Sequence, residues 1–167
     1  MMDELRLVRP APEYAEQIRE YRDEFPADRM QVTHDPERIS GMDYLENYED
    51  ISGWLSFCDS MKDRITWYMS VRKSDGKIVG FSLGEMANSD TFDVHFEKAE
   101  IRMNGAYPMV CRELTRMLMD RHPGLVYINR EDDMGLDALR QSKLSYKPEY
   151  LLEKYIARDN DENDRNT

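Results

Sequence analysis

Two side chains that could move a proton lie two residues apart in a segment of alternating polarity. His95 and Glu97 alternate with apolar residues over residues 91–100, and this period of two is typical of a β-strand. In a regular strand both side chains leave the same face, so the pair could accept the proton that an amine loses before it attacks an acyl carbonyl. The alternative is an exposed polar strand face without a chemical role.

A second polar group follows the short apolar segment 125–128, which is predicted to be a strand buried on both faces. Asn129, Arg130 and Glu131 come directly after it. Loops at the carboxyl ends of strands commonly hold ligands, so these three residues are candidates for lining a cleft. A structural network of Arg130 with nearby carboxylates explains the same residues equally well.

Neither metal chemistry nor hydrolysis by a nucleophilic side chain is indicated. The three histidines, His34, His95 and His122, are scattered, and no HExxH or Cys/His spacing occurs. The chain contains no GxSxG segment. Cys58 and Cys111 lie far apart in predicted helices, and we expect both to be reduced core residues. No metal is expected.

Composition and charge favour one acidic globular domain. The chain has 167 residues, 40% of them hydrophobic, and a formal net charge of -11, which disfavours nucleic acid as a partner. We expect a single domain over residues 1–157 and a disordered acidic tail over residues 158–167. No apolar run is long enough to span a membrane and no signal peptide is evident, so the predicted location is cytoplasmic.

The apolar pattern predicts the elements that would position these residues. A strand, two helices, three antiparallel strands with an Asp-Gly turn in the first hairpin, a helix, a strand, a helix and two final strands follow one another. The predicted ranges are 5–9, 14–25, 43–60, 65–72, 78–83, 91–100, 107–121, 125–128, 133–142, 144–146 and 150–156. Leu136 and Leu139 are expected to face inward from the last helix.

This order of elements resembles the GNAT acyltransferase fold, an α+β fold (α/β in three layers) with a mixed central sheet flanked by helices. The resemblance implies that the strand 91–100 splays from its neighbour and that acetyl-CoA, or another acyl-CoA, lies between them as co-substrate. It also implies that the pyrophosphate sits at the N-terminus of the helix that begins near Gly105. The expected acceptor is a small-molecule amine or an amino group of a larger molecule.

The C-terminal half carries a second resemblance, over about residues 78–155. The segments that carry it are HFEKAE, GAYP, INREDDMG and LRQSKLSYKP. They resemble the C-terminal domain of phosphatidylglycerol lysyltransferases (the DUF2156-type domain) and its uncharacterised bacterial relatives. Characterised members of that family use aminoacyl-tRNA as donor, so the resemblance implies a second function, aminoacyl transfer from tRNA. Such proteins usually carry two GNAT-like repeats, and this chain has room for one.

The GNAT resemblance also assigns residues to the donor. Arg102, Asn104, Gly105, Ala106 and Tyr107 occupy the place of the family's Q/R-x-x-G-x-G/A segment, in which backbone amides cradle the pyrophosphate. Tyr107 replaces the last small residue, however, and Pro108 removes one backbone donor. Gly105 could therefore serve only the turn from strand to helix, or the donor could be held differently.

Tyr146 stands near the position where a tyrosine of that family protonates the departing thiolate, and ordinary packing of the ring is the alternative. The leading prediction is thus an acyl-CoA-dependent N-acyltransferase of the acetyltransferase type. A GNAT-fold protein that binds a ligand without catalysis is a third alternative, motivated by Tyr107 and Pro108. The sequence leaves a homodimer open.

Overall fold

The computed structural model describes residues 4–20, 50–100, 102–153 and 155. The contacts between Cα atoms divide the chain into two compact units, Met1–Glu131 and Asp132–Thr167. The first unit contains the sheet and every side-chain contact on which the candidate site is built. In the described ranges, no helix combines the length and the apolar character needed to cross a membrane.

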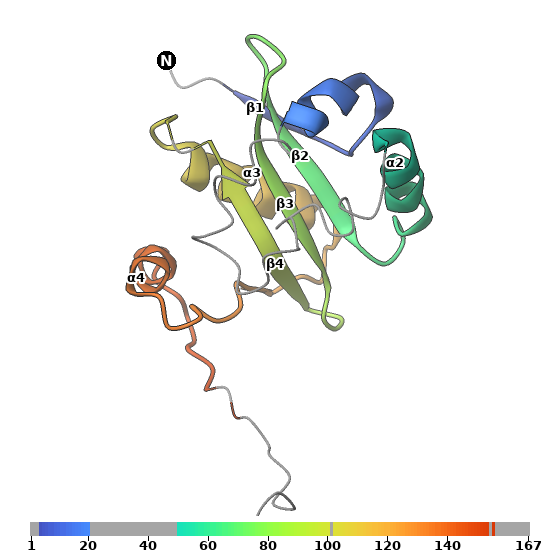
Figure 1. Cartoon of the computed structure of the whole chain (residues 1–167). Helices are drawn as coiled ribbons and strands as arrows, with labels where there is room; N and C mark the ends of the chain where they lie inside the picture. The colour runs from blue at the N-terminus through green and yellow to red at the C-terminus, as the bar shows by residue number, and fades with distance from the viewer. Residues whose placement is uncertain (1–3, 21–49, 101, 154, 156–167) are drawn as a thin grey trace, which may run out of the picture. The chain divides into compact units, whose positions relative to one another are not determined.

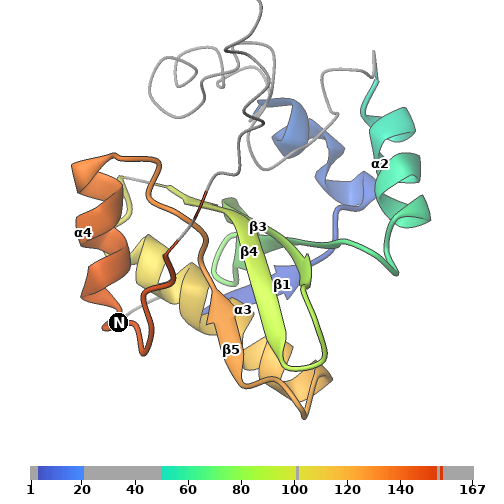
Figure 2. The same ribbon diagram turned by 90° about the horizontal axis from the view of Figure 1, so that it is seen from below.

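The sheet of the first unit is mixed. Its strands are β1 (Leu5–Val8), β2 (Thr66–Arg72), β3 (Ile78–Met86), β4 (Thr91–Ala99) and β5 (Tyr127–Asn129), and they lie side by side in this order (β1 to β4 in Figure 1, β5 beside β4 in Figure 2). β1 to β4 pair antiparallel, whereas β5 pairs parallel to β4. The crossover between β4 and β5 contains helix α3 (Ala106–Arg121). The predicted meander and crossover are therefore confirmed.

One face of the sheet packs against the N-terminal helical turns and helix α2. The 3-10 helix η1 (Pro12–Tyr14) leads into helical residues 15–20, and α2 spans Ile51–Ser60. Asp50 caps α2, since its Oδ1 accepts a hydrogen bond of 2.7 Å from the Gly53 amide. The remainder of the predicted helices, 21–25 and 43–49, lies outside the described residues.

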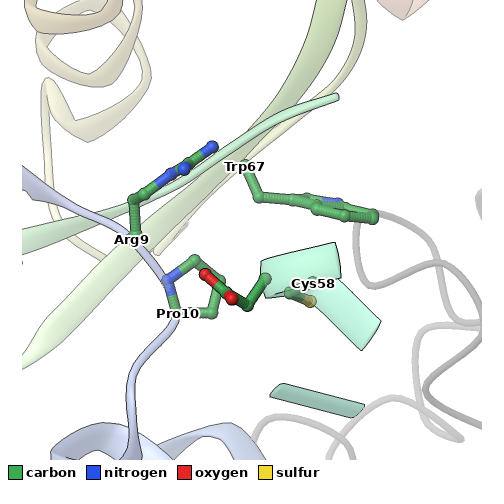
Figure 3. Close-up of a pocket in the computed structure, with 5 residues that line it drawn as sticks. Arg9, Pro10, Cys58 and Trp67 are labelled. Carbon is green, nitrogen blue, oxygen red and sulfur yellow. The ribbon is translucent and has the colours of Figure 1, made fainter. Parts of the chain in front are cut away.

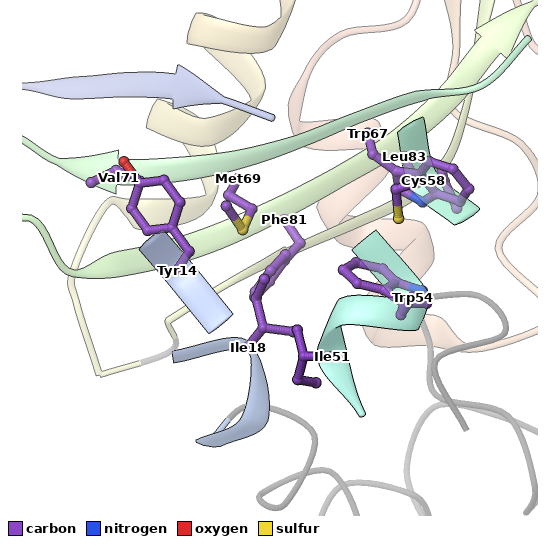
Figure 4. Packing of buried hydrophobic residues seen from close by; sticks show 10 residues of the cluster. All are labelled: Tyr14, Ile18, Ile51, Trp54, Cys58, Trp67, Met69, Val71, Phe81 and Leu83. Carbon is purple, nitrogen blue, oxygen red and sulfur yellow. The ribbon is translucent and has the colours of Figure 1, made fainter. Parts of the chain in front are cut away.

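The core on this face, called the α2 cluster below, contains the tryptophans of α2 and β2 (Figure 4). Trp54 and Trp67 are tilted against each other with ring centroids 6.4 Å apart. Such pairs of aromatic rings add to the stabilisation that burial of their apolar surface provides. Cys58 is buried in the same cluster, which confirms the expectation that it is a core residue.

The opposite face packs against α3. Leu114 and Leu118 contact Phe92 and Val94 of β4 in one cluster, and the first turns of α3 pack on Ala99 in another. Gly80 of β3 lets the helix approach closely, because a Cβ at this position would lie 2.7 Å from Cγ2 of Val110. We refer to these two sides of the sheet as the α2 face and the α3 face.

A β-bulge in β4 changes which side chains reach each face. Leu83 lies opposite Phe96 and Gly84 opposite Val94, so His95 is an extra residue in β4. Before the bulge Val94 packs on the α3 face, whereas Phe96 after it packs against the α2 cluster. Gly84 permits the bulge, because a Cβ there would lie 2.2 Å from the carbonyl oxygen of Asp93.

The second unit differs from the prediction in its elements. Helix α4 spans Asp137–Ser145 and includes Leu144, where a strand was predicted. It ends at Ser145, and Lys147 two residues later has a left-handed φ of 53° and donates its amide to the Leu144 carbonyl. None of the residues of α4 is buried, Leu136 before it is 46% exposed, and residues 150–153 form no strand. The predicted strands 144–146 and 150–156 and the inward position of Leu136 are therefore wrong where the structure describes them.

Candidate active site

The strands β4 and β5 pair only over a short stretch. The pairing ends where Asp93 lies opposite Asn129, and β4 continues to Ala99 without β5 beside it (Figure 2). The predicted strand 125–128 is thus shorter and shifted, and it is not buried on both faces, since Val126 is 65% exposed. Side chains from the second half of β4, from α3 and from the segment after β5 meet beside this separation.

Glu97 is the most deeply buried carboxylate of this group. Its side chain is only 4% exposed, and its Oε1 accepts a hydrogen bond of 3.1 Å from Nη2 of Arg130. The other oxygen, Oε2, is also buried and has no hydrogen-bond partner among the described residues. A buried carboxylate oxygen without a donor is uncommon in folded proteins, and this feature marks Glu97 as a candidate functional residue.

Burial raises the pKa of Glu97 above its ordinary value, although the charge and the hydrogen bond of Arg130 act in the opposite direction. An ion pair alone would lower the pKa of the carboxyl, so removal from water outweighs the guanidinium here. A carboxylate with a raised pKa binds a proton more strongly than a carboxylate in water, and the role of Glu97 as a base remains a prediction.

Arg130 joins Glu97 to helix α3. Its Nη1 lies 2.8 Å from Sγ of Cys111, and its side chain is 23% exposed. Burial and the charge of Glu97 raise the pKa of the Cys111 thiol, and Arg130 compensates only in part. Cys111 is thus a protonated thiol and not an activated nucleophile. It is only partly buried, in contrast to the core position predicted for it.

His95 lies in a different environment from Glu97. Its Nδ1 is 2.6 Å from Oε1 of Glu131, and its Nε2 is 3.3 Å from Oε1 of Glu85, which follows Phe81 and Leu83 on the α2 face. Glu97 instead reaches Cys111 of α3 through Arg130. The prediction that His95 and Glu97 share one strand face is therefore wrong, because the bulge at His95 shifts the alternation by one residue.

Two carboxylates flank the His95 ring and change its titration. Burial, the largest single effect, lowers the pKa of His95, but the hydrogen bonds and charges of Glu131 and Glu85 together raise it above its ordinary value of 6.5. The histidine thus links β3, β4 and the segment after β5 more firmly when it is protonated. Glu131 itself has a left-handed φ of 54°.

This linkage predicts a dependence of stability on pH. A raised pKa in the folded state means that the contribution of His95 is complete below its unfolded pKa and is lost as pH rises through its folded pKa. The side chain is 35% exposed, so we expect less than about 1 kcal/mol. His95→Gln should flatten the fall of Tm between about pH 6 and pH 8, measured by thermal denaturation at constant ionic strength.

Glu131→Gln keeps the histidine but removes one of the two carboxylates that flank it, so it should flatten the same fall of Tm. If His95→Gln has the same pH dependence of Tm as the parent, the two carboxylates do not hold the protonated ring.

The turn before α3 is built around Gly105. This residue is the N-cap of the helix with a left-handed φ of 80°, and no side chain caps the helix there. Some amides of the turn already have acceptors: Ala106 donates to the Met103 carbonyl at 3.1 Å, and Arg102 donates to Oε1 of Glu100, also at 3.1 Å. A pyrophosphate that used the Ala106 amide would have to displace the first of these bonds.

The remaining sequence candidates have structural partners of their own. Oδ1 of Asn129 accepts a hydrogen bond of 3.0 Å from the Glu131 amide, so Asn129 fixes the segment after β5. Asn104 lies within the turn before α3, and Tyr107 in the first turn of that helix is 42% exposed. Tyr146 follows the last residue of α4 in the second unit, and its role as an acid remains a prediction.

Sequence reasoning missed two residues of the site, Cys111 and Glu85. Cys111 lies on the face of α3 that also carries Leu114 and Leu118, so the helical period placed it near the sheet but gave no reason to expect a charged neighbour. Glu85 breaks the apolar run of β3 near its end, and that break is a signal that could have found it.

A small cavity of about 80 Å³ lies elsewhere in the first unit. It is lined by Arg9, Pro10, Cys58, Asp59 and Trp67 (Figure 3). Trp67 and Cys58 belong to the α2 cluster, so the cavity lies on the face of the sheet opposite Glu97. Burial raises the pKa of the Cys58 thiol to about 12, which leaves it inert. Among the described side chains, no group of three His, Cys, Asp or Glu is arranged to hold a metal ion.

The sequence matches a known family over most of the described region. Residues 47–158 match the family described as phosphatidylglycerol lysyltransferase, C-terminal. An uncharacterised protein of Mycoplasmoides gallisepticum is 29% identical over 82 residues, which are 49% of this chain and 25% of that protein. This chain therefore aligns with only about a quarter of that relative.

Solved structures share the fold. A conserved protein of unknown function from Bacteroides thetaiotaomicron matches with a TM-score of 0.58 and 25% identity, over 88% of this chain and 45% of that one. An aminoglycoside N-acetyltransferase in complex with CoA matches with a TM-score of 0.57 and 10% identity, over 95% and 96% of the two chains. A ribosomal-protein-alanine N-acetyltransferase from Brucella melitensis matches with a TM-score of 0.58 and 11% identity, over 93% and 97%. The fold is thus the α+β GNAT fold.

Proposed function

We propose that this chain, which belongs to the phosphatidylglycerol lysyltransferase C-terminal family and has the GNAT fold, transfers an acyl group from acyl-CoA to an amine. One observation carries the proposal: Glu97 presents a buried carboxylate oxygen without a hydrogen-bond partner among the described residues, beside the separation of β4 from β5. Catalysis by proton transfer needs such an acceptor within reach of the attacking amine.

The proposed chemistry uses Glu97 as the base. The amine attacks the acyl carbonyl as the neutral base, and its nitrogen must then lose one proton to become an amide nitrogen. Oε2 of Glu97 accepts that proton. Burial favours this step, because it raises the pKa of the carboxyl and strengthens the hydrogen bond to the incoming amine. Tyr146 is kept as the proposed acid for the departing thiolate.

The separation of the strands and the start of α3 support a position for the donor. Beyond Asp93, β4 runs to Ala99 without β5 beside it, and we propose that the extended part of the donor lies along this half of the strand. The uncapped N-terminus of α3 at Gly105 has the polarity that attracts a phosphate group. A related fold in complex with CoA supports acetyl-CoA as the first donor to test.

The acceptor is proposed to be a small-molecule amine or an amino group of a larger molecule. The formal net charge of -11 attracts cations at long range. Polyamines and other cationic primary amines are therefore the first acceptors to test. Their rates of transfer should fall as ionic strength rises, because salt screens the attraction.

Calorimetry with acetyl-CoA and with CoA tests whether the chain uses this donor. We expect both to bind, with acetyl-CoA and a cationic amine together giving free CoA and an acylated product by mass spectrometry. If neither ligand binds at about 1 mM, a concentration that corresponds to only about -4 kcal/mol of binding free energy, acyl-CoA is not the donor.

The family match supports a second candidate, aminoacyl transfer from aminoacyl-tRNA. The same base would serve both reactions, since each forms an amide or an ester at an acyl carbonyl. A gel shift with aminoacylated tRNA at low salt distinguishes the donors. We expect no shift, because the acidic chain repels polyanions, and a shift that weakens with added salt would favour tRNA over acyl-CoA.

A further inference from the structure

We propose that Arg130 binds the carbonyl oxygen of the acyl group and stabilises the negative charge that develops on it during transfer, exchanging its contact with Cys111 for this oxygen. This inference rests on the proposed function, since it requires an acyl donor beside Glu97. It assigns Arg130 a chemical step that neither the family match nor the related folds provide.

The contact with Cys111 is the first reason. Nη1 of Arg130 lies 2.8 Å from Sγ of Cys111, and a thiol sulfur is a weak hydrogen-bond acceptor. A carbonyl oxygen accepts more strongly, and an oxyanion more strongly still. An acyl group that reaches this position therefore displaces the sulfur at little energetic cost. Nη2 keeps its hydrogen bond to Glu97 meanwhile.

The second reason is the short distance between Arg130, a hydrogen-bond donor, and Glu97, the proposed base. Arg130 Nη2 and Glu97 Oε1 are 3.1 Å apart, so a cationic donor and an anionic acceptor stand side by side. In the tetrahedral intermediate, the oxygen and the attacking nitrogen are bonded to the same carbon and lie close together. Adjacent protein groups can thus contact both atoms at once, Arg130 at the oxygen and Glu97 at the nitrogen.

The third reason is the balance of charge. Before the reaction the carboxylate of Glu97 and the guanidinium of Arg130 neutralise each other, and Glu97 is almost fully buried. When Glu97 accepts the proton of the amine it becomes neutral, and the oxyanion appears in the same step. Arg130 stays charged throughout, because a guanidinium does not lose its proton at working pH. Its counter-ion changes from Glu97 to the oxyanion.

The complete step conserves atoms and electrons. The amine nitrogen forms a bond to the carbonyl carbon, and the π electrons of the carbonyl move to the oxygen, which Arg130 holds. Glu97 takes the proton from the nitrogen. When the carbonyl re-forms, the bond between carbon and sulfur breaks, and the thiolate of CoA leaves with the electron pair. A proton from Tyr146, the proposed acid, or from water then gives the free thiol, and Glu97 releases the proton that it accepted, which restores its starting state.

The test uses two substitutions of Arg130 in the full chain with acetyl-CoA and the best amine acceptor. Arg130→Lys keeps the charge but loses the planar pair of donors, and we expect kcat to fall by about 100- to 1,000-fold, as for removal of one oxyanion donor. The acid limb of its pH profile should stay in place. Arg130→Met also removes the charge, so its acid limb should move to higher pH because the pKa of Glu97 rises further.

Further measurements on control variants keep the outcome clear. Arg116→Lys, on the exposed side of α3, is the control and should keep parental kcat. CoA affinity by calorimetry should be unchanged in Arg130→Lys, because CoA lacks the acyl group, and acetyl-CoA affinity should change little, because the carbonyl contact strengthens mainly during reaction. Cys111→Ser offers Arg130 a stronger competing acceptor and should lower kcat, whereas Cys111→Ala removes the competitor and should not lower it.

The outcomes separate this inference from the proposed function. A parent that transfers no acyl group contradicts both. A parent that transfers normally, together with an Arg130→Lys variant within about threefold of its kcat, overturns the role of Arg130 alone. The acid limb of Arg130→Lys could also shift to a pH that by itself accounts for the whole fall in kcat. That result would show that Arg130 acts only through the titration of Glu97, and it would also overturn the inference.

Discussion

Glu97→Gln is expected to lower kcat for acyl transfer by about 100- to 10,000-fold, the range typical of a lost general base. The amide keeps the size and one oxygen acceptor of the carboxylate but cannot take a proton. The acid limb of kcat/KM against pH, which reports the pKa of Glu97, should disappear from the residual activity. Steady-state kinetics from about pH 5 to pH 9 test both results.

The same substitution is not expected to unfold the protein. Because burial raises the pKa of Glu97, the folded state prefers the neutral side chain, and the stability that this group contributes is lost as pH rises through its folded pKa. Removal of the charge from a buried site therefore offsets the loss of the counter-ion of Arg130, and we expect Tm at neutral pH to stay close to that of the parent. Glu113→Gln, which removes a carboxylate paired with Arg112 and Arg116 on α3, is the control for activity.

Two results would contradict the role of Glu97. Full activity of folded Glu97→Gln would mean that another group accepts the proton. Strong binding of CoA by the parent, with no turnover of any amine tested and no effect of Glu97→Gln on affinity, would favour the reading of the chain as a ligand-binding protein without catalysis.

Gly105→Val is expected to weaken CoA binding by at least about tenfold, or about 1.4 kcal/mol. The left-handed φ of 80° at this position is strained for any residue with a Cβ, and the branched side chain would stand beside the first amides of α3. The pyrophosphate would then lose its close approach to the helix N-terminus. Calorimetry with CoA measures the effect directly.

Strain must be separated from the loss of a binding surface, and Gly76 offers a matched control. It has a left-handed φ of 73°, and an added Cβ meets nothing within 4 Å, as at Gly105. Gly76 lies in the turn between β2 and β3. Gly76→Val should therefore lower Tm about as much as Gly105→Val does, but it should keep the parental affinity for CoA. Equal affinities in the two variants would mean that the donor does not use the turn at Gly105.

Much of the fold could be predicted because local patterns are strong in the first unit. The alternation of apolar residues around Trp67 and Val71 predicted β2, and Asp75-Gly76 predicted the hairpin turn, since Gly76 has the left-handed φ that such turns require. The stripe that includes Leu114 and Leu118 predicted α3 and the face that it buries. These features depend on neighbours in sequence.

The candidate site could be predicted only in part, because it depends on the bulge at His95. Alternation alone predicts that His95 and Glu97 lie on one face, and no residue type within 91–100 indicates a β-bulge. The cause lies on the neighbouring strand, where Gly84 accommodates the displaced backbone of Asp93. The pairing of Glu97 with Arg130 joins residues 33 positions apart, which a single sequence does not reveal.

The errors in the second unit have a different origin. Short runs such as Leu144 to Tyr146 fit a strand or a helix equally well, and here helix α4 continues to Ser145. Tyr150, Leu151 and Leu152 are between 62% and 83% exposed, so no burial of these side chains stabilises a strand there. The local sequence pattern alone therefore does not distinguish helix, strand and irregular structure in these segments.

A crystal structure of the chain with bound acetyl-CoA is the most direct test of acyl transfer at Glu97. The account predicts that the donor lies along β4 beyond Asp93, with its pyrophosphate at Gly105 and its thioester carbonyl within hydrogen-bonding distance of Arg130. Oε2 of Glu97 should then face the side of the carbonyl carbon from which an amine attacks. Acetyl-CoA bound elsewhere in the structure, with the contact between Arg130 and Cys111 intact, would contradict the account.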